Sequence, residues 1–513
     1  MTDHLGVTPH VPSTDAVLDD AQPPDQDQDS IGSRAGRGFG WAMAGQVVMK
    51  MGSFGVSLVM VRLMAPHDFG LYAVALAVNA FVIHVNDMGM IAATVQWRGR
   101  VEDMAATART MSAAFSVAWY AVIFTAAPFI AELAGSPDAT HLVRLLSLTI
   151  LLDGVTAVSV GVLLRTFRQD ALMKAIAIGF VFSAVISITC AVNGAGAISF
   201  VLGMMAQSAV VGVIVLRKAG IPIRFGFDRV IAQRLIVFGA PLALGLGIES
   251  ILMYSDSVII GHELGTDVLG FYLLAFNVSS WVPGMVGTAV RYVSIPAFSR
   301  LAEGDKEALD DGVQRSLPMM IALVAPIAAL MAALSPALIH FLYGKEWIES
   351  ADALRFLAAV MVARMFTALV FDIQTGLGNT RFTVLLNVVW LVALVPSLWF
   401  GAHYGGMSGA AAAHAVIALL VAMPFATWML HRAGVDMVPV AKRIARPVLA
   451  GVAAGLTMAA VAHPIESHFV QLVVAGGSGF LLYGLLAFPA RTRRYAWSRV
   501  RPLLARGAGP SSG

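Results

Sequence analysis

The segment that organises this chain runs from Arg62 to Ala75 and reads RLMAPHDFGLYAVA. It ends one long apolar segment and begins the next, which is typical of a tight hairpin between two membrane helices. About 200 residues later, residues 262–275 read HELGTDVLGFYLLA. Three residues recur at the same spacing: Gly70 as Gly270, Tyr72 as Tyr272 and Ala75 as Ala275. Solenoid repeats span only roughly 20–50 residues. A repeat this long therefore indicates two equivalent halves, a plan that many transporters share.

The composition is that of a membrane protein. Of the 513 residues, 58% are hydrophobic and 13% are charged, which is far more apolar than an average soluble domain. Apolar runs recur along the chain, each long enough to cross a bilayer core of about 30 Å. The formal net charge is only +3 and the basic residues lie in short loops, so nucleic acid is not an expected partner. With Cys190 as the only cysteine, no intrachain disulfide can form.

We therefore expect an all-α polytopic membrane protein with about fourteen transmembrane helices, arranged as two six-helix lobes and a C-terminal helix pair. Because six is an even number, the two lobes should point the same way through the membrane, as a parallel repeat about an axis along the bilayer normal. The expected division is a disordered cytoplasmic tail at 1–35, the first lobe at 36–220, the second lobe at 221–434, helices thirteen and fourteen at 435–492, and a basic cytoplasmic tail at 493–513.

Lysine and arginine placement predicts the orientation. With the N-terminus inside, 27 of the 34 basic residues fall on the cytoplasmic side. The basic residues expected at the outer surface are Arg62, Arg144, Lys345 and Arg355, and those within the membrane are Lys50, Arg291 and Arg364. Because cytoplasmic loops carry the excess of positive charge, we expect a multi-pass protein of the cytoplasmic membrane with both termini cytoplasmic.

Further segments resemble a known family when taken together with the opening hairpin. They are DMGMIAATVQW at 87–97, YGKEW at 343–347, FDIQTGLGNTRF at 371–382 and YGGMSGAAAA at 404–413. Their order and spacing resemble the polysaccharide-repeat-unit flippases of the multidrug/oligosaccharidyl-lipid/polysaccharide superfamily, over residues 38 to about 430. The resemblance implies a V-shaped, two-lobed transporter that works by alternating access. It also implies a polyprenyl-diphosphate-linked oligosaccharide as the substrate, moved from the inner to the outer leaflet.

Other functions remain open at this stage. A peptidoglycan-precursor flippase or a cation-coupled multidrug exporter of the same superfamily are the nearest alternatives. A membrane-embedded polysaccharide polymerase or acyltransferase is disfavoured, because every predicted outer loop is short. We expect a transporter and not an enzyme, with no catalytic residues, coupled to H⁺ or Na⁺ and working as a monomer. No Walker A sequence and no cluster of cysteine and histidine occurs, so neither ATP, a metal nor another cofactor is expected.

Four residues are candidates for binding the substrate. Ionisable groups within a membrane are costly and usually face protein or water, so each indicates a site. Lys50 lies about 18 Å along the first helix, at 1.5 Å per residue, too deep for its side chain to reach the surface. Arg291 and Arg364 are the other membrane cations, and Asn277 shares one helix face with Arg291. Each cation has a structural alternative: Lys50 neutralising Glu249, Arg291 at the cytoplasmic interface, and Arg364 paired with Asp372.

Two acids and one helix break complete the candidates. Glu249 and Asp256 are seven residues apart on one face and are the predicted ion-coupling groups, with a structural salt bridge as the alternative. We expect Glu249 to lie deeper, whereas Asp256 would be close enough to the outer surface to be hydrated. Pro283 removes a helical hydrogen bond beside Gly284, and this pair is the predicted hinge.

Overall fold

The computed structural model describes residues 49–488 apart from 87–88, 98, 167, 288–289, 292–293, 295–296, 299–300 and 302–305. Every regular element in the described ranges is a helix, which confirms the all-α prediction. Ten described helices are long and apolar enough to cross a membrane. The count of fourteen stays a prediction, because the first helix is described only from residue 49. Both predicted tails, 1–35 and 493–513, lie outside the described residues.

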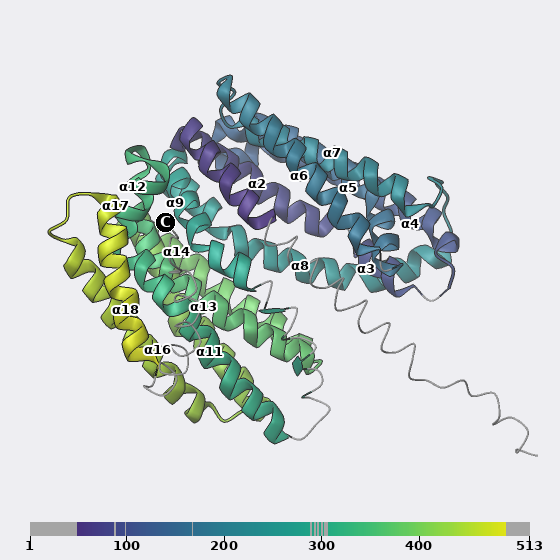
Figure 1. Cartoon of the computed structure of the whole chain (residues 1–513). Helices are drawn as coiled ribbons and strands as arrows, with labels where there is room; N and C mark the ends of the chain where they lie inside the picture. Colours follow the sequence, from purple (N-terminus) through teal and green to yellow (C-terminus); the bar gives the residue numbers. More distant parts are fainter. Residues whose placement is uncertain are drawn as a thin grey trace, which may run out of the picture. The chain divides into compact units, whose positions relative to one another are not determined.

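The first half of the repeat begins with a helix at residues 49–63 and continues through six more (Figure 1). They are α2 (Pro66–Asn86), α3 (Met90–Gln96), α4 (Val101–Leu133), α5 (Thr140–Arg165), α6 (Gln169–Val192) and α7 (Ile198–Ala219). The predicted second span is thus divided into α2 and the short α3. Gly89 caps α3 with φ 67°, a left-handed conformation that glycine adopts without strain.

The second half follows the same order but is interrupted more often. Its elements are α8 (Arg229–Leu264), α9 (Thr266–Ser279), the π-helical η3 (Pro283–Gly287), α11 (Lys306–Ala333), α12 (Ser335–Tyr343), α13 (Ser350–Gly376), α14 (Thr380–Ile417), the π-helical η5 (Ala418–Ala422) and α15 (Met423–Arg432). Gly406 (φ 60°) kinks α14 within the YGGMSGAAAA segment at 404–413. The predicted break at Pro283 is present as η3.

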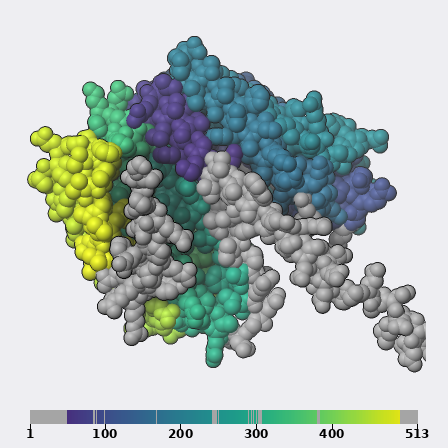
Figure 2. All heavy atoms as spheres, viewed as in Figure 1, coloured from purple at the N-terminus to yellow at the C-terminus, as the bar shows by residue number. Residues whose placement is uncertain are grey.

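A C-terminal set of helices follows the repeat, as expected from the sequence. It consists of α16 (Met437–Ala462), α17 (His468–Val470), the π-helical η6 (Gln471–Ala475) and α18 (Gly476–Ala487). The helices α16 and α18 pack on α11, at the edge of the molecule coloured yellow in Figure 2. Tyr483 donates a hydrogen bond of 2.7 Å to the carbonyl oxygen of Ala322 there. The set therefore extends the second half.

The extended segment between the halves, residues 220–228, is bound to α4. Arg109 is fully buried and donates a hydrogen bond of 2.7 Å to the carbonyl oxygen of Pro222. Thr107 Oγ1 accepts a hydrogen bond from Asp228 N, and Asp228 in turn caps α8 by accepting from Val230 N. Side-chain capping of this kind fixes where a helix starts. The start of α8 is thereby held against the first half.

The equivalent helices α2 and α9 pack directly against each other. A Cβ added to Gly70 would clash with the carbonyl oxygen of Thr266, and one added to Gly270 would clash with that of Pro66. Residues 66 and 70 occupy the same places in the repeat as 266 and 270. The contact is therefore reciprocal, as expected where two equivalent halves meet about a two-fold axis.

Further contacts between the halves gather at the same end of the bundle. We call it the hairpin end and define it by the turns at residues 64–65 and 265. His67 Nδ1 and Asp267 Oδ1, again equivalent positions, form a hydrogen bond of 2.9 Å. Arg62 Nε donates a hydrogen bond of 3.1 Å to the carbonyl oxygen of Leu342. These contacts close the two halves onto each other at the hairpin end.

Candidate functional site

The segment from α9 to η3 organises the candidate site. The α-helix α9 ends at Ser279, and η3 continues the chain with wider π-helical turns from Pro283. Pro283 has no N–H to donate, so the regular ladder is interrupted, while Gly284 N still donates to Ser280 O at 2.9 Å. The structure thus has an irregular segment where the sequence predicts one. A hinge at Pro283 and Gly284 stays a prediction.

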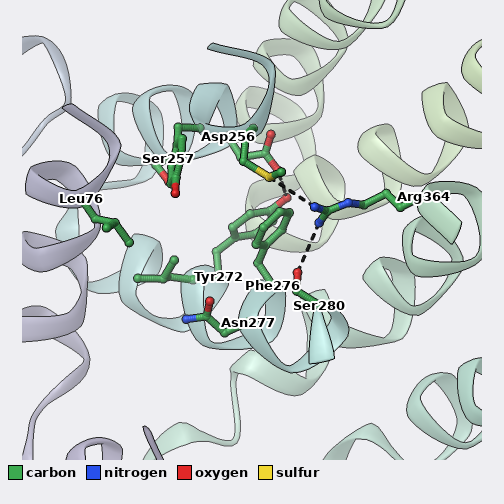
Figure 3. A pocket seen from close by; sticks show the side chains of 11 residues that line it. Leu76, Asp256, Ser257, Tyr272, Phe276, Asn277, Ser280 and Arg364 are labelled. Atoms are coloured by element: carbon green, nitrogen blue, oxygen red, sulfur yellow. Dashed lines mark hydrogen bonds between the residues drawn. The ribbon is translucent and has the colours of Figure 1, made fainter. Parts of the chain in front are cut away.

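A cavity of about 200 Å³ lies beside this segment, among α8, α9 and α13 (Figure 3). We call it the α9 cavity. Its lining residues are Leu76, Met253, Tyr254, Asp256, Ser257, Tyr272, Leu273, Phe276, Asn277, Ser280 and Arg364. It therefore brings together an acid, a cation and an amide that the sequence had singled out on three different helices.

Arg364 points into this cavity from α13. Its Nη1 donates a hydrogen bond of 3.2 Å to Ser280 Oγ, and its Nη2 lies 3.3 Å from Met253 Sδ. The guanidinium also lies 5.1 Å from the ring centroid of Phe276, a distance at which a cation is attracted to an aromatic face. The structural alternative, a pair between Arg364 and Asp372, is not formed.

Arg291, and not Arg364, pairs with Asp372. Its Nε lies 3.2 Å from Asp372 Oδ1, and Ser294 donates a hydrogen bond of 2.6 Å to Asp372 Oδ2. Asp372 is buried, whereas 62% of the Arg291 side chain is exposed. The buried carboxylate therefore anchors one side of the guanidinium and leaves the other N–H groups open to a ligand. It also offsets part of the charge of Arg291.

Lys50 extends from the first helix towards η3. A Cβ on Gly284 would lie 3.6 Å from Lys50 Nζ, so the ammonium group is beside the π-helical turn. One turn further along, Phe54 packs edge-on against Trp281 with 4.3 Å between ring centroids. Lys50 is exposed, and it forms no salt bridge with another described residue. The side chain of Glu249 lies outside the described residues, so the proposed pairing of the two stays open.

The three cations thus follow one path along the α9–η3 segment. Arg364 contacts Ser280, Lys50 lies beside Gly284, and Arg291 comes four residues after the end of η3. Asn277 lines the cavity one turn before Ser280. The sequence places these residues on three separate helices, and the tertiary structure collects them around the broken α9–η3 segment.

Asp256 is the buried acid of the site. Its Oδ2 accepts hydrogen bonds from Tyr272 Oη at 2.6 Å and His414 Nδ1 at 2.8 Å. Only 3% of Asp256 is exposed, so the expectation of a hydrated residue near the surface is wrong. His414 comes from α14 and is not among the residues that the sequence predicts for the site. Its one signal there is a histidine in the otherwise apolar stretch that follows the Gly405-Gly406 turn.

Comparison with known proteins tests the family resemblance that the sequence motifs indicate. The profile of the family described as "Polysaccharide biosynthesis protein" matches residues 59–352, more than half of the chain. The succinoglycan biosynthesis transport protein ExoT of Rhizobium meliloti is 26% identical over 88% of this chain and 92% of its own length. The lipopolysaccharide biosynthesis protein WzxC of Escherichia coli is 23% identical over 68% of this chain and 72% of its own length.

Among solved structures, the lipid II flippase MurJ in an inward closed conformation superposes with a TM-score of 0.70. The superposition covers 89% of this chain and 100% of the MurJ chain, at 13% sequence identity. The two proteins therefore share a fold. The resemblance read from the hairpin and the spacing of the motifs is thus confirmed at the level of the family. This chain belongs to the polysaccharide biosynthesis protein family.

Proposed function

We propose that this chain is a transporter that moves a polyprenyl-diphosphate-linked oligosaccharide across the cytoplasmic membrane, by alternating access coupled to an ion gradient. Family membership, relatives named for succinoglycan transport and lipopolysaccharide biosynthesis, and the flippase fold support the proposal. The observation that carries it is the path of Lys50, Arg291 and Arg364 along one broken helix. We further propose that the protein works as a monomer.

The diphosphate group explains why cations are needed there. An anion that leaves water for an apolar cavity must exchange its hydration for fixed positive charge, because an unpaired buried charge is costly. Arginine binds phosphate oxygens through two parallel hydrogen bonds, and lysine acts as a compact point charge. Arg364 and Arg291 would hold the diphosphate in this way, with Lys50 adding positive charge beside Gly284 and Asn277 donating from the cavity wall.

The reciprocal packing of α2 and α9 supports alternating access. Two equivalent halves that close on each other at one end provide one of the two states that such a cycle requires. The irregular turns at Pro283 and Gly284 would let the α9–η3 segment bend as the halves separate. The coupling ion would act through the acids of α8, Glu249 and Asp256.

The alternatives differ in the chemistry they require. A cation-coupled multidrug exporter carries cationic or apolar compounds, and three cations around η3 disfavour such cargo. A peptidoglycan precursor carries the same diphosphate, so only the choice of glycan separates that substrate from a polysaccharide unit. Binding measurements should therefore compare both classes of lipid-linked glycan.

Removing the cations should weaken substrate binding. A hydrogen bond to a charged group is worth roughly 1.5–3 kcal/mol. Lys50→Ala and Arg364→Ala are therefore each expected to bind polyprenyl-diphosphate sugars about 10- to 100-fold more weakly in proteoliposomes, with Lys50→Arg retaining part of the affinity. Arg291→Ala should show a smaller loss, because Asp372 already offsets its charge.

The matched control is Arg355→Ala, which removes an arginine that pairs with Asp352 far along α13. Its affinity should equal that of the unmodified protein. A double variant tests the rival role of Lys50: if Lys50→Ala combined with Glu249→Ala restores transport, Lys50 neutralises Glu249 and does not bind the substrate.

We also propose that the hairpin end faces outwards and both termini face the cytoplasm. Asn193 and Asn379 are exposed residues between helices, and the predicted topology places them on opposite sides of the membrane. On a background with Cys190 replaced, Asn193→Cys should react with an impermeant thiol reagent in intact cells, and Asn379→Cys should react only after lysis. The reverse pattern would invert the orientation. Gly135 is unsuitable for a probe, because a Cβ there would clash with the carbonyl oxygen of Gly261.

A further inference from the structure

Asp256 has an incomplete set of hydrogen bonds for a buried carboxylate. Both of its donors, Tyr272 Oη and His414 Nδ1, serve Oδ2. Its Oδ1 is buried and has no hydrogen-bond partner among the described residues. An ionised carboxylate offers about four lone-pair positions, and leaving buried positions empty is costly. The geometry therefore leaves one oxygen of a membrane-embedded acid free to receive a cation or a proton.

The surroundings of Asp256 fit a proton better than a metal ion. A hard cation needs several oxygen ligands, and no group of three metal-binding side chains occurs among the described residues. The side chains that face Asp256 are two hydrogen-bond donors, and the positively charged Arg364 lines the same cavity. That charge repels a metal ion, whereas a proton on Oδ1 needs no further ligands.

The titratable groups around Asp256 come from four helices. Tyr254 lies with Asp256 on α8, Tyr272 is on α9, Arg364 is on α13 and His414 is on α14 (Figure 3 labels all but Tyr254 and His414). His414 Nδ1 shares a hydrogen bond of 2.8 Å with Asp256 Oδ2, while Asp256 Oδ1 has no hydrogen-bond partner among the described residues. Asp256 and His414 can therefore share one proton between Oδ2 and Nδ1, or hold a second proton on Oδ1, without a change of geometry.

We propose that Asp256, Tyr272 and His414 form the proton-binding site of the transporter, and that its occupancy sets how strongly Arg364 binds the diphosphate. The inference rests on the proposed function and names its coupling ion. When Asp256 is ionised, its negative charge offsets Arg364. When a proton occupies the site, the cavity gains one positive charge and Arg364 is free to pair with the substrate.

Proton binding at Asp256 and diphosphate binding at Arg364 should strengthen each other, because thermodynamic linkage is reciprocal. A coupling between two sites is typically worth a factor of roughly 5 to 150 in affinity, and each ligand changes the binding of the other by the same factor. Lower pH should therefore strengthen diphosphate binding, and the bound diphosphate should promote proton uptake. Asp256→Asn mimics the protonated acid, so it should bind the anion tightly at every pH.

The test uses the full chain in lipid nanodiscs and a fluorescent polyprenyl diphosphate as the probe. Affinity is measured at about pH 6 and about pH 8, on either side of neutral pH. The unmodified protein should bind roughly tenfold more tightly at the lower pH. In Asp256→Asn the ratio of the two affinities should fall to the value measured with Arg364→Ala. That reference variant shows how much of the ratio comes from the titration of the probe itself. Asp153→Asn, a membrane acid of α5 outside the cavity, should keep the full ratio.

A second readout does not depend on the substrate. Dicyclohexylcarbodiimide reacts with protonated carboxyl groups in apolar surroundings, and peptide mass spectrometry measures the label on Asp256. Labelling should increase as the pH falls, and His414→Gln should change the pH of half-labelling. An unlabelled Asp256 at both pH values, or an unchanged pH ratio in Asp256→Asn, overturns the proton site. If labelling titrates but the protein binds no diphosphate, the proton site stands and the proposed substrate is wrong.

Discussion

Gly270→Ala is expected to reduce transport at least about tenfold, because the added methyl group would occupy the space of a backbone carbonyl. The Cβ would clash with the oxygen of Pro66, which belongs to the rigid start of α2. Forcing extra atoms into a packed contact typically costs about 1–3 kcal/mol or more. The halves would have to separate at the hairpin end, so the closed state would be poorly populated. Flipping of the lipid-linked substrate in proteoliposomes measures the loss.

The same substitution should be detectable without a substrate. Cysteines at His67 and Asp267, whose side chains are 2.9 Å apart, should be joined by a short bifunctional thiol reagent in the otherwise unmodified protein and more slowly with Gly270→Ala. Gly484→Ala is the matched control, because nothing lies within 4 Å of a Cβ at that helical position. Normal transport and normal cross-linking in Gly270→Ala would show that this close contact is dispensable.

Trp347→Ala should be the most destabilising single truncation at the hairpin end. Trp347 belongs to the 3-10 turn η4 (Lys345–Trp347), is 1% exposed and donates a hydrogen bond of 3.1 Å to Val61 O. Its ring packs edge-on against Phe69 of α2 and Phe271 of α9. Replacing a buried tryptophan by alanine typically costs about 3–5 kcal/mol. We expect a clear fall in the midpoint of thermal unfolding in detergent.

Because the contacts of Trp347 join the two halves, its loss should also slow the cross-linking of cysteines at 67 and 267. Trp347→Phe keeps an aromatic ring and should restore much of the stability, although it loses the hydrogen bond. Trp399→Ala is the control, since that side chain is 41% exposed and should change the unfolding midpoint little. Equal effects of Trp347→Ala and Trp399→Ala would show that η4 does not hold the halves together.

Much of the architecture can be predicted from the sequence, because the bilayer imposes strict rules. A chain with long apolar runs must satisfy its backbone hydrogen bonds within helices, so the all-helical class follows from composition. The recurrence of Gly70 as Gly270 indicates two equivalent halves. Pro283 predicts the interruption seen at η3, because proline has no backbone N–H to donate.

The candidate site could be predicted only as a set of residues, and its pairings were beyond the sequence. Spacing along one helix tells which residues share a face, but it does not tell which neighbouring helix that face meets. Arg364 and Asp372 share the helix α13, yet Arg364 turns to Ser280 while Asp372 binds Arg291. Both choices depend on the position of the broken α9–η3 segment, which is a tertiary property.

The contact between Asp256 and His414 could likewise not be predicted from the sequence. They are 158 residues apart in the chain and 2.8 Å apart in the structure. The sequence by itself determined a helical membrane protein of two repeated halves, with charged groups inside the membrane that must face protein or water. Only the packing of α8, α9, α13 and α14 decided which of these charges meet, because helices that are apolar on nearly every face carry no periodic signal for their partners.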